Sequence, residues 1–122
     1  MERARIKINV IDLLIKEAEK GNANHQFELG VAYSEGEIVE QNFEKSFEWC
    51  LKAAEQGHAN AQVLVGLMYN EGVGVTGNEE KTFEWIIKAG EQGNEKAIEF
   101  LQEAAEQCHE KAQFFIINFY KV

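Results

Sequence analysis

The chain has 122 residues, 45% of them hydrophobic, and carries a formal net charge of −9. This length indicates one domain that can bury a core without disulfides or metal ions. The excess of acidic residues disfavours binding to DNA or RNA, because phosphate contacts need clusters of lysine and arginine. Proline is absent, which suits a chain that is nearly all helical.

The first helix is predicted over about residues 6–20, where apolar residues recur among basic ones. Lys7, Asp12 and Lys16 interrupt the apolar residues, so no run is long enough to span a membrane. No small-residue cleavage site follows this segment. The sequence therefore predicts a soluble, cytoplasmic protein with no membrane partner.

Two copies of one repeat follow, at residues 22–57 and 58–93. Laid over each other without a gap, they are identical at 19 of 36 positions. Each copy predicts a helical hairpin: an A helix over about 23–34 or 59–70, a loop containing glycine, and a B helix that begins after Asn42 or Asn78. Gly57 and Gly93 are predicted to end the B helices in the left-handed conformation.

The period breaks after the second copy. Residues 104–109 resemble residues 53–58 at an offset of 51, so one helix over about 95–107 replaces a hairpin, and a last helix follows over about 110–121. A single domain, 1–122, is thus predicted in four parts: an opening B-type helix in 1–21, repeats at 22–57 and 58–93, and an irregular helix pair in 94–122.

The second copy carries a dense motif that resembles the Sel-1-like repeat family, a relative of the tetratricopeptide repeats. The matching residues are Ala59, Ala61, Gln62, Gly66, Tyr69, Gly72, Gly74, Val75, Lys81, Trp85, Lys88, Ala89, Glu91, Gln92 and Gly93. The likeness is specific over residues 14–93 and partial beyond them. It implies an all-α, right-handed solenoid of about six helices that binds other proteins and is not an enzyme.

The sequence contains few motifs typical of catalysis or ligand binding, and no catalytic, cofactor or metal site is predicted. The sequence holds no phosphate-binding loop, no nucleophile elbow and no His/Cys cluster with metal spacing. His58 and His109 share one repeat register, which favours a structural role. Cys50 and Cys108 allow at most one disulfide and are expected to be buried or half-buried thiols.

Partner-binding residues are expected on the A helices, because the family resemblance places these helices on the concave face. The positions outside the shared core are Asn24, His25, Glu28, Val31 and Glu35 in the first repeat, and Asn60, Leu64, Leu67, Asn70 and Glu71 in the second. Glu28 and Leu64 are equivalent, so an apolar residue stands where its copy has a charge. Contact with a partner and plain packing both explain that difference.

The last helix adds a second candidate surface. Phe114 and Ile117 fall outside its main apolar face, although a terminal solenoid helix normally shows a polar outer side. Two interpretations stay open: these residues form a patch for a partner or a homodimer, or residues 94–109 fold over them.

The acidic charge narrows the expected partner to a basic protein. Small acidic proteins in families resembling this one include immunity proteins, which neutralise interbacterial toxins. A nuclease toxin is basic because its substrate is a polyanion, so an acidic inhibitor would associate with it quickly. The alternative is a small adaptor or scaffold in bacterial signalling or envelope assembly, for which charge complementarity is unnecessary.

Overall fold

The computed structural model describes the backbone of residues 2–121 and the side chains of residues 10–121. Over this range the chain forms seven helices and no strand, which confirms the all-α class; each of the predicted helical segments is present. The helices are α1 (Glu2–Glu19), α2 (Ala23–Glu35), α3 (Phe43–Glu55), α4 (Ala59–Glu71), α5 (Glu79–Glu91), α6 (Glu95–Glu106) and α7 (Glu110–Phe119).

Every helix from α2 to α7 begins at an asparagine or histidine whose side chain accepts a hydrogen bond from a backbone N–H three residues later. These N-caps are Asn22, Asn42, His58, Asn78, Asn94 and His109. Such a bond satisfies one of the backbone donors that a helix leaves unpaired at its start. Gly57 and Gly93 follow the B helices with φ of 94° and 84°, which confirms the predicted left-handed ends.

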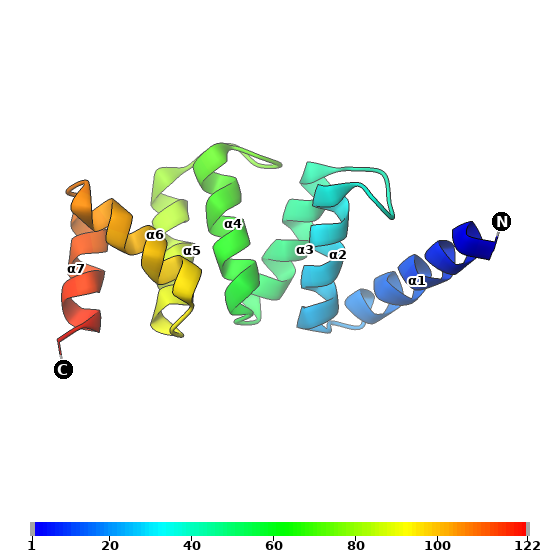
Figure 1. Cartoon of the computed structure of the whole chain (residues 1–122), viewed down its shortest axis with the longest axis horizontal. Coiled ribbons are helices and arrows are strands. Elements are labelled where there is room, and N and C mark those ends of the chain that lie inside the picture. Colours follow the sequence, from blue (N-terminus) through cyan, green and yellow to red (C-terminus); the bar gives the residue numbers. More distant parts are fainter. Residues whose placement is uncertain (1, 122) are drawn as a thin grey trace.

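The helices stack in chain order into an elongated solenoid, with α1 at one end and α7 at the other (Figure 1). The hairpins α2/α3 and α4/α5 are the two complete repeats, and each pair packs closely along its length. Within the described range no helix is both apolar enough and long enough to cross a membrane.

A glycine in the middle of each A helix permits this close packing. A Cβ added at Gly66 would lie 2.7 Å from the Ile86 side chain and 3.2 Å from the Thr82 carbonyl oxygen, both in α5. Gly30 faces α3 in the same way, with the Ser46 carbonyl oxygen 3.1 Å from the added atom. The helix-propensity cost of glycine is therefore offset by contact between backbones.

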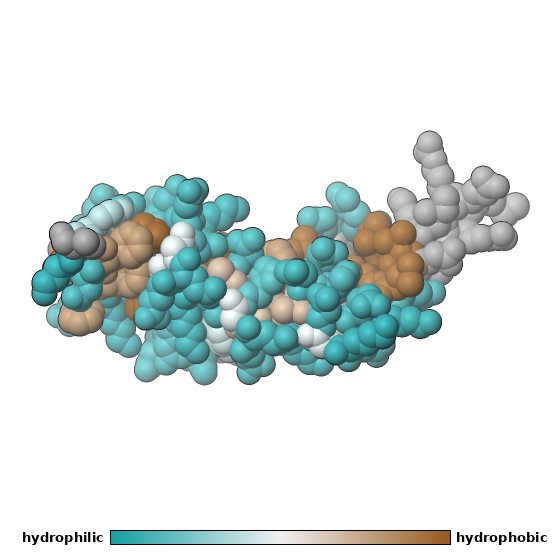
Figure 2. Space-filling view, turned by 90° about the horizontal axis from the view of Figure 1, so that it is seen from below, coloured by the Kyte–Doolittle hydropathy of each residue, from teal (hydrophilic) through white to brown (hydrophobic). Residues whose placement is uncertain are grey.

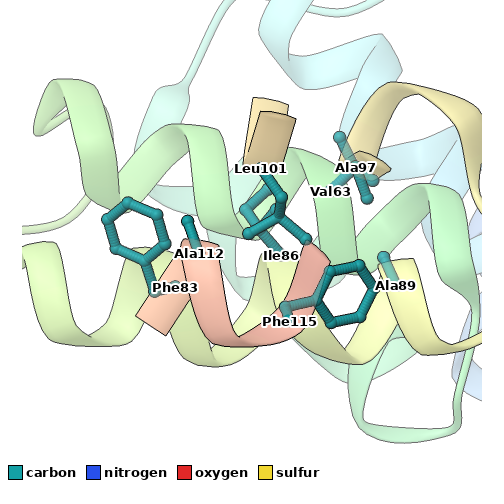
Figure 3. Close-up of a cluster of buried hydrophobic side chains, with 8 residues drawn as sticks. All are labelled: Val63, Phe83, Ile86, Ala89, Ala97, Leu101, Ala112 and Phe115. Carbon is teal, nitrogen blue, oxygen red and sulfur yellow. The ribbon is translucent and has the colours of Figure 1, made fainter. Parts of the chain in front are cut away.

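Two buried clusters hold the stack together. One consists of side chains from α3 and α4, with Trp85 of α5 packed against it. The other joins α4 to α7 and is drawn in Figure 3: Val63, Phe83, Ile86, Ala89, Ala97, Leu101, Ala112 and Phe115. Because α4 contributes buried residues to both clusters, the core is continuous along the solenoid.

The cysteines differ in their surroundings, although both are free. Cys50 is fully buried in α3, as expected. Cys108 is exposed, so the expectation of a buried or half-buried thiol was wrong for this residue. It occupies the left-handed position that Gly57 and Gly93 occupy elsewhere, with φ of 66°, in the turn between α6 and α7.

Candidate partner-binding surface

Basic residues are absent from the stretches that contain the two A helices of the repeats. Residues 21–44 hold five glutamates and residues 53–80 hold four, and neither stretch contains lysine or arginine. In the repeats the lysines lie instead on the B helices α3 and α5. The charged residues of the A helices α2 and α4 are therefore all acidic: Glu28, Glu35 and Glu71.

The lysines of the B helices lie over aromatic rings. Lys52 is 4.5 Å from the centre of the Trp49 ring, and Lys88 is 4.6 Å from that of Trp85. Glu48 stands three residues after Lys45 and four before Lys52 on the same helix, but between residues 10 and 121 the only ion pairs within 4 Å are Lys20–Glu17 and His109–Glu79. Attraction to the ring face is a sufficient reason for this choice.

The first groove lies between α1 and α2. Glu28, Val31 and Glu35 line it, as three of the predicted partner-binding residues. Val10, Leu14 and Ile38 complete its apolar floor, and Glu37 adds a further carboxylate at the rim. These four residues were not predicted, because they come from the opening helix and the interhelical loop.

A second groove lies between α2 and α4 and contains Leu64, Leu67 and Glu71, again predicted residues. Leu64 packs on one buried cluster and Leu67 on the other, so each is half-buried and presents only part of its side chain. This agrees with both explanations of the Glu28–Leu64 difference, since the same leucine packs and lines a groove.

A third, more polar groove runs from the end of α4 to α6 and the start of α7. Asn70 is the predicted residue that lines it. Glu79, Glu103 and His109 also lie there and were not predicted. Nε2 of His109 is 3.4 Å from a carboxylate oxygen of Glu79, and its ring stacks on Phe83 with centroids 3.6 Å apart.

The remaining predicted residues of the A helices line none of these grooves. Asn60 accepts a hydrogen bond of 3.0 Å from the side chain of Asn94, and Asn24 is exposed at the start of α2. His25 is half-buried, and its Nδ1 is buried with no hydrogen-bond partner. The A-helix positions thus divide among three grooves instead of forming one continuous site.

Phe114 and Ile117 are 72% and 66% exposed on α7, at the C-terminal end of the stack. The interpretation in which residues 94–109 cover them is wrong, because α6 directs Ala97 and Leu101 into the cluster that also holds Ala112 and Phe115. A groove of about 730 Å³ beside α5 is lined by Phe114 but not by Ile117. Figure 2 shows hydrophobic surface at both ends of the molecule.

Histidines 58 and 109 have the structural role that their register predicts. In each, Nδ1 accepts a hydrogen bond from the backbone and caps a helix. His58 also stacks on Phe27, and burial lowers the pKa of its ring from the ordinary 6.5. Among the side chains that the structure describes, no three of the metal-ligating types come together.

The Sel1 repeat family model matches residues 26–58, 59–94 and 94–107. Among solved structures, a Sel1 repeat protein from Oxalobacter formigenes is 37% identical, with a TM-score of 0.72 over 75% of this chain. Cysteine-rich protein B from Helicobacter pylori is 26% identical, with a TM-score of 0.73 over 77% of this chain. A protective antigen of uropathogenic Escherichia coli with an SLR fold is 27% identical, with a TM-score of 0.66 over 84%.

The chain spans 71% of the Helicobacter protein but only about a quarter of the other two, 26% and 27%. A comparison with curated proteins gave no match. The matched repeats cover most of the described helices, and the solved relatives share their arrangement. The chain therefore belongs to the Sel1 repeat family, whose helical solenoids act as protein-interaction modules.

Proposed function

We propose that this protein captures one basic protein on its A-helix side and, most concretely, that it is an immunity protein that neutralises a basic, nuclease-like toxin. One observation supports this above all others: the A helices α2 and α4 and the loops that follow them carry five glutamates and no lysine or arginine. A nuclease must be basic where it binds its polyanionic substrate, so its active site and this surface are complementary in charge.

The three grooves give the proposal a mechanism. Each has glutamates at its edge, and the first two also have apolar floors formed by residues such as Val31 and Leu67. Glutamates that are exposed to solvent speed the encounter with a basic partner, whereas apolar side chains that become buried in the complex slow its dissociation. A toxin seated across these grooves would have its nucleic-acid site covered.

The test begins with affinity capture from the source cell and elution along a salt gradient. A single basic partner near one-to-one stoichiometry is then purified, and its nuclease activity is titrated with this protein. Loss of activity at one equivalent is the expected result. A partner that keeps full activity when saturated would rule out neutralisation and leave only the binding role.

Charge reversal locates the surface. The triple variant Glu28→Lys, Glu35→Lys, Glu71→Lys should slow association with the basic partner by roughly tenfold or more at low salt, because long-range attraction is lost. Lysine substitutions at Glu48, Glu55 and Glu84 on the B helices are the matched control, since all three are exposed and the change in net charge is the same. Equal slowing by both sets would mean that net charge matters and the A-helix side does not.

A second function is supported by the exposed apolar residues at the two ends of the solenoid, Leu13 near one end and Phe114 near the other. An adaptor that bridges two proteins needs separate surfaces of this kind. Capture of several partners that bind at the same time, with affinities that do not depend on salt, would favour the adaptor in signalling or envelope assembly over the immunity protein.

A further inference from the structure

The opening helix α1 has an open face that is closed in both complete repeats. By the 36-residue register, Val10 and Leu14 are equivalent to Ser46 and Cys50 of α3, which are fully buried against α2. Val10 is instead 50% exposed, and Leu14 lies in the groove beside α2. In the repeat register, this α1/α2 groove is therefore the position that the A helix paired with α1 would occupy.

The last helix α7 has the complementary open face. It is an A-type helix, because Gln113 donates to the Ala105 carbonyl just as Gln62 donates to that of Ala54. Ile117 occupies the register position of Gly30 and Gly66, which face B helices at close range. In the described structure no B helix lies against Ile117, and its side chain is 66% exposed.

We propose that α7 of one molecule docks in the α1/α2 groove of a second copy, so that an A helix and a B helix from different chains pair head to tail. The two open faces are those that meet inside each complete hairpin, supplied here by opposite ends of the molecule (Figure 1). This inference does not depend on the proposed function.

The repeat register specifies the contacts. Gly30 faces Ser46 and Cys50, so Ile117 of one copy faces Val10 and Leu14 of the next. Ser34 lines a groove with Leu64 and Glu71, and its equivalent in the register is Lys121, two residues beyond the end of α7. One repeat earlier in the sequence, the equivalents of Leu64 and Glu71 are Glu28 and Glu35. The proposed contact therefore places Lys121 of one copy beside these two carboxylates of the next copy.

The charges of the two elements agree with this docking. Among the described residues that line the groove, Glu28, Glu35 and Glu37 are acidic and none is basic. Residues 110–121 carry two lysines and one glutamate, so they form one of the few positive segments of an acidic chain. Attraction between these segments opposes the repulsion between two molecules of net charge −9.

Isoleucine in place of glycine sets the spacing of the pair. The Ile117 side chain excludes the backbone-level approach that Gly30 and Gly66 permit, so α7 must lie farther from α1 than α2 lies from α3. Contact is then made through side chains, over an area the size of one helix. Association of this kind is weak, with a dissociation constant on the order of 10–100 µM.

Head-to-tail contact differs from a two-fold dimer in a way that can be measured. A two-fold pairing through α7 uses the same patch on both copies and stops at two. The contact proposed here leaves a free α7 and a free groove at the ends of every assembly, so the assembly grows with concentration or closes into a ring.

Sedimentation velocity of the full chain over roughly 0.02–1 mM tests the idea. The average mass of the unmodified protein should rise with concentration, whereas Val10→Glu and Ile117→Glu should each stay monomeric. A mixture of these two variants should form a one-to-one dimer and nothing larger, because one intact α7 meets one intact groove. Leu13→Glu is the matched control: it is also exposed on α1 and adds the same charge, and it should assemble normally.

Three outcomes would overturn the proposal. The unmodified chain could stay monomeric throughout the range. Val10→Glu could assemble as the unmodified chain does, which would indicate a two-fold pairing through α7. The mixture of variants could also remain monomeric. Because Val10 and Ile117 are at least half exposed, circular dichroism should confirm that both variants stay folded.

Discussion

Gly30 and Cys50 show how one residue pair sets the distance between two helices. Gly30 lacks the Cβ that would meet the Cys50 side chain, and the thiol fills the remaining space as a small apolar group. In the second repeat Ile86 replaces the cysteine and its larger side chain reaches over Gly66. The glycine is thus the constant element, and the residue that faces it varies.

The two thiols should differ sharply in reactivity. Burial raises the pKa of the Cys50 thiol to about 11, while a hydrogen bond with Ser46 opposes the shift only in part. Cys108 is exposed. A disulfide reagent at about pH 8 should therefore modify one thiol of the folded protein quickly and the second only after unfolding, since the thiolate is the nucleophile.

The variant Cys108→Gly provides the control for this experiment. It places glycine at the same left-handed position that Gly57 and Gly93 occupy, so the turn should form without strain. The folded variant should show no rapidly modified thiol. Rapid modification of the variant would mean that α3 opens locally and exposes Cys50.

At the scale of the element, the repeat alone was enough to predict the four helices α2 to α5. Their predicted starts agree with the structure, and the predicted ends of α2 and α4 are one residue early. The agreement is close because Asn42 and Asn78 mark helix starts and the terminal glycines mark helix ends in the local sequence. The last helix ends sooner than predicted, at Phe119, where no glycine marks a C-terminus.

A ladder of glutamines was missed in the sequence. Gln26 and Gln62 are nearly fully buried, and each donates to a carbonyl of the preceding B helix. Gln56 and Gln92 then donate to these two side chains at 2.7 and 2.9 Å. Glutamine is usually a surface residue, so its recurrence in register was the only signal that could have revealed this role.

The stability of α4 should depend on pH through its histidine cap. Burial lowers the pKa of His58 in the folded chain, so near pH 6.5 and below the unfolded chain binds more protons. The contribution of this residue to the free energy of unfolding is retained above about pH 6.5 and is lost as the pH falls below it. Protonation also removes the acceptor that Nδ1 offers to Ala61.

Urea denaturation at about pH 7.5 and 5.5 measures the effect. His58→Asn is the informative comparison, because asparagine caps α2 and α6 at the equivalent turns and does not titrate. The variant should be less stable than the unmodified chain at both pH values, since the stacking on Phe27 is gone. Its free energy of unfolding should, however, fall less between about pH 7.5 and 5.5 than that of the unmodified chain. An equal loss on acidification would assign the pH dependence to other groups.

At the scale of the whole molecule, the grooves of the candidate partner-binding surface could be predicted only in part. The repeat register predicted several residues that line grooves but not the three separate grooves themselves, because a groove is formed by two neighbouring elements. Val10 and Ile38 line a groove from outside the A helices. The pattern set Phe114 and Ile117 apart from the main apolar face of their helix but left open whether residues 94–109 cover them. The packing of α6 leaves both exposed.

The two proposals meet at the α1/α2 groove. Glu28 and Glu35 lie where a basic partner would be attracted and where α7 of a second copy would dock. The second copy offers two lysines, whereas a nuclease offers a larger basic surface, so the partner should displace the weaker self-contact. Neutralisation and self-association would then be alternatives for one groove, with the central groove at Leu64 and Leu67 left to the partner alone.

Local stability should fall from the middle of the solenoid towards its ends. In a stack where each unit contacts only its neighbours, protection from hydrogen exchange follows the number of packed neighbours. α4 contributes buried residues to both core clusters, and α5 contacts both. Among the described side chains, by contrast, the buried hydrophobic ones are Ala18 in α1, and Ala112 and Phe115 in α7. Backbone amides of α4 and α5 should exchange slowest, and those of α1 and α7 fastest.

Concentration separates this gradient from the effect of self-association. At about 10 µM the chain is expected to be mostly monomeric, so the amides of both ends should exchange quickly. At about 1 mM the protection of α1 and of α7 should rise together, because each helix covers the other in the head-to-tail contact. The Ile117→Glu variant should keep fast exchange at both ends at either concentration. Protection that rises in α7 alone would point to a two-fold contact, because a head-to-tail pair cannot cover one end of the solenoid without covering the other.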